Sequence, residues 1–186
     1  MLIMVHLFHI LPGGMPLISY ASAVLCSVGL RLWLIFAAGA MVLWYLLGRQ
    51  EIALRSAIIY TAFVLMLTLF SREGNHQQAA AWIPLWSWGQ VLFHGNRALF
   101  FQICLNMLLF VPLGALLCCC RWVQQQQRPL LTICLTGLVL SAAIETTQLL
   151  FHLGLFEWDD MLHNTVGCLL GGLTTTHLVV VKGAGG

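Results

Sequence analysis

Charged residues are scarce in this chain: they make up 8% of its 186 residues, whereas hydrophobic residues make up 60%. An ordinary soluble domain contains about 25% charged residues. The mean hydropathy is correspondingly high, at +0.92. This composition excludes a typical water-soluble domain and indicates an all-α membrane protein.

The features of several other protein classes are also missing. The eight Lys and Arg residues are scattered and the net charge is only +2, so no nucleic-acid-binding surface is expected. No positively charged segment precedes the first apolar residues, which argues against a cleaved signal peptide. The chain has no internal repeat, phosphate-binding loop or zinc-ligand spacing, and no cofactor is predicted.

Seven cysteines lie within or at the ends of apolar segments, where they are expected to act as small hydrophobic residues. Cys118, Cys119 and Cys120 form the one cluster. Consecutive helical residues point about 100° apart, so these three thiols do not close a tetrahedral metal site. No metal site is predicted, and acylation at the membrane edge is the alternative role for the cluster.

A membrane-spanning helix needs about 20 apolar residues, and five segments approach that length. The predicted spans are 31–48, 55–71, 99–119, 130–152 and 161–181. The first 30 residues also carry no Lys, Arg, Asp or Glu, but Pro12-Gly13-Gly14 interrupts them. Residues 15–30 therefore extend the first span, form a re-entrant piece, or make a sixth crossing. The predicted fold is a polytopic transmembrane helical bundle of about five spans, with six as the alternative.

Basic residues in the short connections predict the orientation. Five of them fall on one side of the five-span arrangement: Arg49, Arg55, Arg121, Arg128 and Lys182. The positive-inside tendency places that side in the cytoplasm. The connection 72–98 and the acidic turn 152–160 then lie outside a bacterial inner or plasma membrane.

Three tryptophans lie in the outer connection: Trp82, Trp86 and Trp88. Indole rings are enriched at the boundary between membrane and water, so the simplest interpretation is an interfacial belt. The alternative is a binding role, in which the rings stack on a sugar or an amphipathic ligand.

A set of polar residues interrupts the last three spans. Ser141, Glu145, Gln148 and His152 are spaced 4, 3 and 4 residues apart, so they share one face of a helix. A carboxylate within a bilayer costs at least about 3 kcal/mol, so it requires partners. At 1.5 Å per residue, Glu145 and Asn106 both lie about 10 Å inside the outer ends of their spans. The predicted binding residues of a shared outer-leaflet polar pocket are Asn106, Ser141, Glu145, Gln148, Asp159, Asp160 and Asn164.

The same residues have structural interpretations. Amide and hydroxyl side chains form hydrogen bonds between membrane helices. Asp159 and Asp160 would stabilise the N-terminus of the last helix, or would hold a divalent cation near His163 and Glu145. A protonated Glu145 would donate a hydrogen bond to one of two amides, Asn106 or Gln148.

Small residues and a proline predict close helix packing. Gly167 and Gly171 form a small-xxx-small pair. Pro112 leaves the carbonyl of Leu108 without its usual amide donor and is expected to kink its helix. With Gly114, two residues after this proline, these are the predicted packing residues.

In this order and at these spacings, the motifs resemble the VanZ-like family of small bacterial membrane proteins. The resemblance covers 99–173 and rests on three motifs: Asn106 with Phe110-Val111-Pro112-Leu113-Gly114, Ser141-x-x-x-Glu145-x-x-Gln148, and Asp160-x-x-x-Asn164-x-x-Gly167-x-x-x-Gly171. Phe156-Glu157-Trp158 departs from the family, which often has a basic residue there. The chain thus divides into unmatched N-terminal membrane segments, 1–50, and a VanZ-like membrane domain, 51–186.

The resemblance implies a multi-pass protein of the bacterial cell envelope, because the family's namesake is associated with resistance to teicoplanin. The leading hypothesis is a pocket that binds a lipid-linked or amphipathic envelope component, or alters the exposure of that component. The glycopeptide itself is an alternative ligand, and membrane lipids are further expected partners. The rival is a membrane enzyme with Glu145 as general acid or base, which the lack of an activated nucleophile disfavours. The third hypothesis is an assembly subunit whose polar core is purely structural. Nothing in the sequence specifies an oligomeric state.

Overall fold

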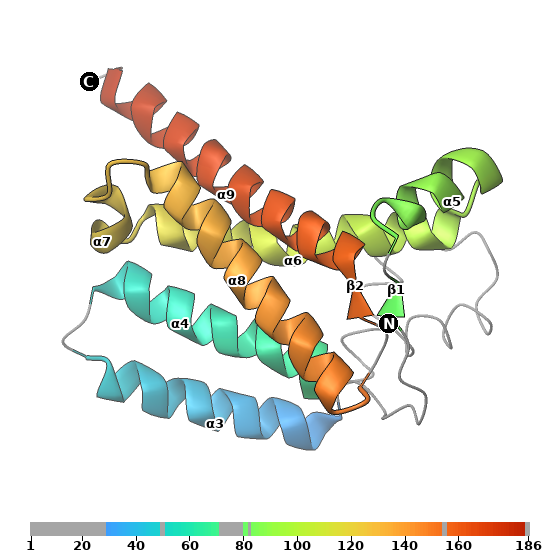
Figure 1. Cartoon of the computed structure of the whole chain (residues 1–186). Coiled ribbons are helices and arrows are strands. Elements are labelled where there is room, and N and C mark those ends of the chain that lie inside the picture. The colour runs from blue at the N-terminus through green and yellow to red at the C-terminus, as the bar shows by residue number, and fades with distance from the viewer. Residues whose placement is uncertain (1–28, 49–50, 71–79, 82, 154–155, 185–186) are drawn as a thin grey trace.

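A computed structural model describes residues 29–48, 51–70, 80–81, 83–153 and 156–184 of the chain (Figure 1). In these ranges the fold is all-α apart from two strands of two residues each, as predicted. The helices are α3 (Leu30–Leu46), α4 (Ile52–Leu65), α5 (Trp86–His94), α6 (Arg97–Cys118), α7 (Arg121–Gln124), α8 (Pro129–Leu150) and α9 (Trp158–Ala184). A π-helical turn, Met66–Phe70, extends α4, and the strands β1 (Ala80–Ala81) and β2 (Phe156–Glu157) pair in parallel.

Each of the five predicted spans falls on a helix whose ends lie within three residues of the predicted ones. Three helical segments are long and apolar enough to cross a membrane: Ile52–Leu69, Arg97–Cys118 and Pro129–Leu150. Arg31–Leu46 is apolar but shorter. The prediction of an all-α membrane protein is therefore confirmed. The number of crossings stays a prediction, and residues 1–28, the place of the suggested sixth crossing, lie outside the described part.

Successive long helices run in alternating directions through the molecule (Figure 1). Helix α5 and the two strands lie at one end, and α7 lies at the opposite end, near the C-terminus. The core includes Val64 of α4, Phe110 and Leu113 of α6, Ile144 of α8 and Cys168 of α9. This arrangement brings the start of α6, the end of α8 and the start of α9 to the same end of the molecule.

Helices α6 and α9 approach each other through glycines. A Cβ atom added at Gly167 would overlap the backbone carbonyl of Met107, and one at Gly171 would overlap that of Val111. From the other side, a Cβ at Gly114 would overlap the carbonyl of Cys168. The structure thus places all three glycines that the sequence assigned to packing in the contact between α6 and α9.

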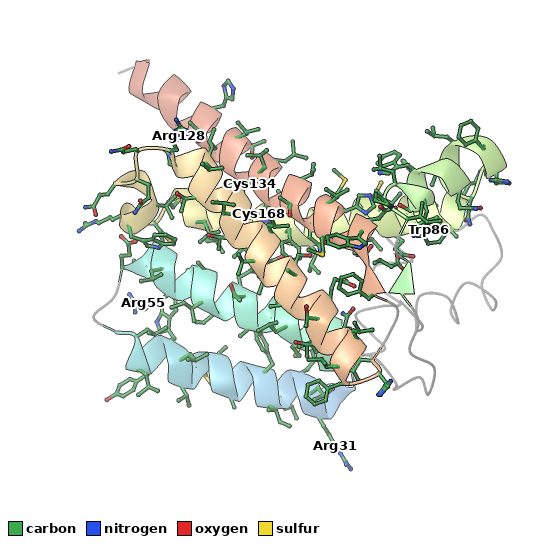
Figure 2. All side chains as sticks on the ribbon, viewed as in Figure 1. Arg31, Arg55, Trp86, Arg128, Cys134 and Cys168 are labelled. Atoms are coloured by element: carbon green, nitrogen blue, oxygen red, sulfur yellow. The ribbon has the colours of Figure 1, made fainter. Side chains whose placement is uncertain are left out.

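Two further contacts connect the remaining long helices. The thiol of Cys168 on α9 donates to the carbonyl of Ile133 on α8 (3.5 Å; Figure 2). Pro112 lies inside α6 with its ring exposed. Near this proline, the Tyr60 hydroxyl of α4 donates to the carbonyl of Leu109 at 2.9 Å. The sequence analysis predicted a free carbonyl one residue earlier, at Leu108.

The connection 72–98 contains a helix, α5, that the sequence analysis did not predict. It begins after Leu85, whose φ of 61° is in the left-handed region, and it ends at Gly95, whose φ is 63°. A left-handed residue after a helix is a common C-terminal cap, and glycine takes it without strain. Trp82 and residues 71–79 of this connection lie outside the described ranges.

Candidate polar site

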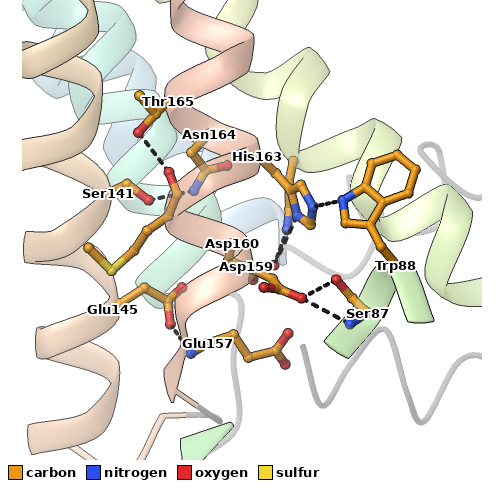
Figure 3. Close-up of polar contacts among 12 residues, drawn as sticks. Ser87, Trp88, Ser141, Glu145, Glu157, Asp159, Asp160, His163, Asn164 and Thr165 are labelled. Carbon is orange, nitrogen blue, oxygen red and sulfur yellow. Dashed lines mark hydrogen bonds and ion pairs between the residues drawn. The ribbon is translucent and has the colours of Figure 1, made fainter. Parts of the chain in front are cut away.

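Buried polar side chains gather toward the end of the molecule that holds α5 and the two strands (Figure 3). Those that are at most 7% exposed are Ser87, Gln102, Ser141, Glu145, Gln148, Glu157, Asp159, Asp160, His163 and Asn164. Eight of these residues, together with the half-buried Trp88 and Asn106, form hydrogen-bonded groups that are here called the polar cluster: Ser87, Trp88, Asn106, Ser141, Glu145, Glu157, Asp159, Asp160, His163 and Asn164. It joins α5, α6, α8, β2 and α9.

Asp159, at the start of α9, holds the N-terminus of α5. Its Oδ1 accepts from the amide of Leu85 at 2.5 Å, and its Oδ2 accepts from the amide of Ser87 at 2.9 Å and from the Ser87 hydroxyl. Backbone amides at a helix N-terminus favour a carboxylate, because they donate hydrogen bonds and form the positive end of the helix dipole. Asp159 therefore caps a helix 72 residues away in sequence, a role that the sequence did not predict for it.

His163 connects α5 to α9 through a hydrogen bond. The Trp88 Nε1–H donates to His163 Nε2 at 2.9 Å. Nδ1 lies 3.9 Å from Asp160 Oδ1, and that oxygen accepts from Asn106 Nδ2 at 2.7 Å. The series Trp88, His163, Asp160 and Asn106 links α5, α9 and α6.

The carboxylate of Glu145 points into the protein, with 2% of the residue exposed. Its Oε2 accepts from the backbone amide of Glu157 at 2.9 Å. One turn earlier on α8, the Ser141 hydroxyl accepts from Asn164 Nδ2 at 2.8 Å. Helix α8 therefore contacts both the segment that precedes α9 and the first turns of α9. The Oε2 contact of Glu145 with a backbone amide was not predicted from the sequence, and a hydrogen bond from Glu145 to Asn106 or Gln148 stays a prediction.

Gln148 lies apart from the polar cluster. Its Nε2 donates to the carbonyl of Thr68, in the π-helical turn after α4, at 3.1 Å. A π-helical turn leaves carbonyls outside the regular hydrogen-bond pattern, which explains why an amide side chain reaches one here. Of the seven predicted binding residues, six belong to the polar cluster and Gln148 faces α4.

The sequence analysis did not assign Ser87 or Glu157 to the site, and it considered His163 only as a neighbour of a cation. It considered Trp88 as part of an interfacial belt or as a surface that stacks on a ligand, but did not predict its hydrogen bond with His163. Among the described residues, no group of three or more His, Cys, Asp or Glu is placed to hold a metal ion. The alternative of a divalent cation at Asp159 and Asp160 thus receives no support there.

Within the described ranges, buried atoms near this end of the molecule that have no hydrogen-bond partner include Trp86 Nε1, Gln148 Oε1 and His163 Nδ1. Leaving a buried donor or acceptor unsatisfied costs about 1–3 kcal/mol. Such atoms are uncommon in proteins, and they mark positions where a ligand or water would gain hydrogen bonds.

The cysteine cluster lies at the opposite end, in the turn between α6 and α7. Cys119 is exposed, whereas Cys120 is fully buried and its thiol donates to the carbonyl of Leu116 at 3.3 Å. Burial, with smaller contributions from the nearby Glu51 and Cys119, raises the pKa of Cys120 to about 11. Cys120 is therefore a poor nucleophile at neutral pH, and acylation stays a prediction for its exposed neighbour.

The apolar helices and their buried polar cluster define this protein as an all-α membrane protein with a hydrophilic core at one end. A family model described as VanZ/LLP1 matches residues 57–179, a range that extends from α4 into the last part of α9. The chain belongs to this family, as its motifs predicted. Comparison with curated proteins and with solved structures finds no match.

Proposed function

We propose that this protein is a multi-pass protein of the bacterial inner or plasma membrane that binds the polar headgroup of an amphipathic envelope component. The binding site is the outer end of α5, α6, α8 and α9, where the polar cluster lies. Lipid-linked cell-wall precursors and glycopeptide antibiotics are the ligand classes that membership of the VanZ/LLP1 family suggests.

The observation that carries this proposal is that three buried atoms at this end of the molecule have no hydrogen-bond partner among the described residues. His163 Nδ1 belongs to the cluster, Trp86 Nε1 is on α5, and Gln148 Oε1 lies apart from the cluster, toward α4. A polar core that served only to hold the helices together would be expected to satisfy its own donors and acceptors. One acceptor and two nitrogen atoms without partners are better explained by a ligand that carries hydroxyl or carbonyl groups. A lipid-linked sugar or a peptide headgroup has both.

The distribution of charge supports an outer location. Four of the six acidic residues lie in or beside the polar cluster: Glu145, Glu157, Asp159 and Asp160. The opposite end holds α7 and the basic connections, with Arg55 and Arg128 (Figure 2). Because basic connections tend to remain in the cytoplasm, the acidic end faces outward.

The direct test replaces Glu145 by Gln. This change keeps the size of the side chain and an oxygen that accepts from the Glu157 amide, but it removes the negative charge. Lipids that co-purify with the parent protein are identified by mass spectrometry and compared with those of the variant. We expect at least one lipid-linked envelope species to be lost with Glu145→Gln, together with any protection of the host against a glycopeptide.

Glu51→Gln is the matched control, because Glu51 lies at the opposite end and contacts Arg121. It should retain the same lipids as the parent. If Glu145→Gln and the parent carry identical lipids at equal membrane levels, the cluster is not a binding site. Conversion of a labelled lipid-linked precursor by the parent, but not by Glu145→Gln, would favour the rival membrane enzyme.

A further inference from the structure

Arg55, near the start of α4, has no acidic partner in the part of the chain that the structure describes. Its guanidinium carbon lies 4.2 Å from the centre of the Trp44 ring of α3, between the two helices (Figure 2). Its Nε is buried and has no hydrogen-bond partner among the residues that the structure describes. An arginine is charged at every physiological pH, so this site contains a fixed positive charge and an unused donor.

Glu51, the acidic residue next to Arg55 on the helix, is already paired with Arg121. Glu51 lies one turn before Arg55, but its Oε1 accepts from the backbone amide of Arg121 at 2.8 Å, and its Oε2 lies 3.6 Å from the Arg121 Nε. The other acidic residues that the structure describes are at the polar cluster, at the far end of the helices. Among the residues that the structure describes, no carboxylate is therefore placed to pair with Arg55, and its guanidinium is available to an anion from outside the chain.

The surroundings of Arg55 fit a phosphate group of a lipid. Trp44 is 41% exposed and its neighbour Tyr45 is 84% exposed, and aromatic residues of this kind gather where the membrane meets water. Phospholipid phosphates lie at the same level. The guanidinium presents its donors in a planar fork that matches two phosphate oxygens. Stacking on Trp44 fixes the plane of that fork before a ligand arrives, which lowers the entropic cost of binding.

We propose that Arg55 and Trp44 form a phosphate-binding site for the headgroup of an anionic phospholipid, at the opposite end from the polar cluster. The site is separate from the proposed headgroup site at the cluster and does not depend on it. A free phosphate compound has the same binding chemistry, so the experiment must distinguish the two sources.

The test uses the full-length protein in mixed micelles that contain equal amounts of phosphatidylglycerol and phosphatidylcholine. Native mass spectrometry then measures the lipid that remains bound. The parent should retain phosphatidylglycerol in preference to phosphatidylcholine. Arg55→Gln should bind it about ten-fold more weakly, because a hydrogen-bonded ion pair is lost. Arg128→Gln is the matched control, since Arg128 is an exposed arginine at the same end, and it should behave as the parent.

A second variant, Trp44→Leu, retains the charge of Arg55 and removes only the stacking surface. It should also weaken phosphatidylglycerol binding, which keeps the test informative if Arg55→Gln does not fold. Equal retention of phosphatidylglycerol by the parent, Arg55→Gln and Trp44→Leu would overturn the proposal. Displacement of the lipid by excess inorganic phosphate would overturn the lipid assignment in favour of a soluble phosphate compound, whereas resistance to phosphate would support it.

Discussion

At the scale of single residues, the buried carboxylates of this protein are stabilised by backbone amides. Asp159 accepts from the amides of Leu85 and Ser87, and Glu145 accepts from the amide of Glu157. Hydrogen bonds to the ionised form favour a carboxylate that would otherwise be costly to bury. The acids therefore fix the position of the chain segments that supply those amides, and they do so without a buried cation among the described contacts.

The hydrogen bond between Trp88 and His163 can be measured with a double-mutant cycle. His163→Leu removes the acceptor of the Trp88 Nε1–H, so we expect it to lower the free energy of unfolding in detergent by about 1–3 kcal/mol. Trp88→Phe in the same background should then cost less than it does in the parent, because the unsatisfied donor is removed. Strict additivity of the two single changes would show that the hydrogen bond contributes nothing.

At the scale of the elements, the contact between α6 and α9 determines where the polar side chains meet. Glycines at positions 114, 167 and 171 allow the two backbones to touch. Within a bilayer, such close packing replaces the hydrophobic effect as the force that associates helices. This contact brings Asp160 of α9 within hydrogen-bonding distance of Asn106 of α6, so the polar cluster depends on small residues that lie outside it.

A single methyl group should test this packing. Gly167→Ala places a Cβ against the backbone carbonyl of Met107, which cannot move aside as a flexible side chain would. We expect the unfolding free energy to fall by about 1–3 kcal/mol, the range for overpacked cores. Gly39→Ala on α3 is the control, because a Cβ there meets nothing within 4 Å. If both variants unfold at the same denaturant concentration as the parent, the backbone contact is not as tight as described.

At the scale of the whole molecule, the two ends differ in chemistry. One end contains the polar cluster with most of the acidic residues, and the other contains α7 with the basic connections and the Arg55–Trp44 pair (Figure 1). Because the long helices run from one end of the molecule to the other, these two ends are separated by the length of a long helix. A 22-residue helix such as α6 is about 33 Å long at 1.5 Å per residue, enough to cross the hydrocarbon core.

Reporter fusions test the orientation of the whole molecule. A phosphatase that is active only outside the cytoplasm should be active when fused after Gly95, which ends α5, and inactive when fused after Gln125, in the α7 connection. The expected pattern follows from the excess of arginine at the α7 end. The opposite pattern would place the polar cluster on the cytoplasmic side and would contradict the proposed outer site.

Part of the site could be predicted from spacing. Ser141 and Glu145 lie on one face of α8, and Asp160 and Asn164 lie on one face of α9, because side chains four residues apart share a face of any helix. Spacing does not identify the partner, however. The sequence analysis considered only side chains as partners of Glu145, and it did not predict the hydrogen bond from the backbone amide of Glu157. That pairing depends on how the chain enters α9, which local periodicity does not determine.

The sequence by itself determined the class of this protein, the positions of its five long helices and its family, because hydrophobic length and motif spacing are local properties of the chain. Only the tertiary structure decided that α5 exists as a docked helix. Its nine residues are too few to form a stable helix alone in water, so the cap that Asp159 provides from α9 is needed. The contact between Trp88 and His163 was likewise known only from the tertiary structure. The two residues are 75 positions apart in sequence, and their contact depends on a helix arrangement that close glycine contacts make possible.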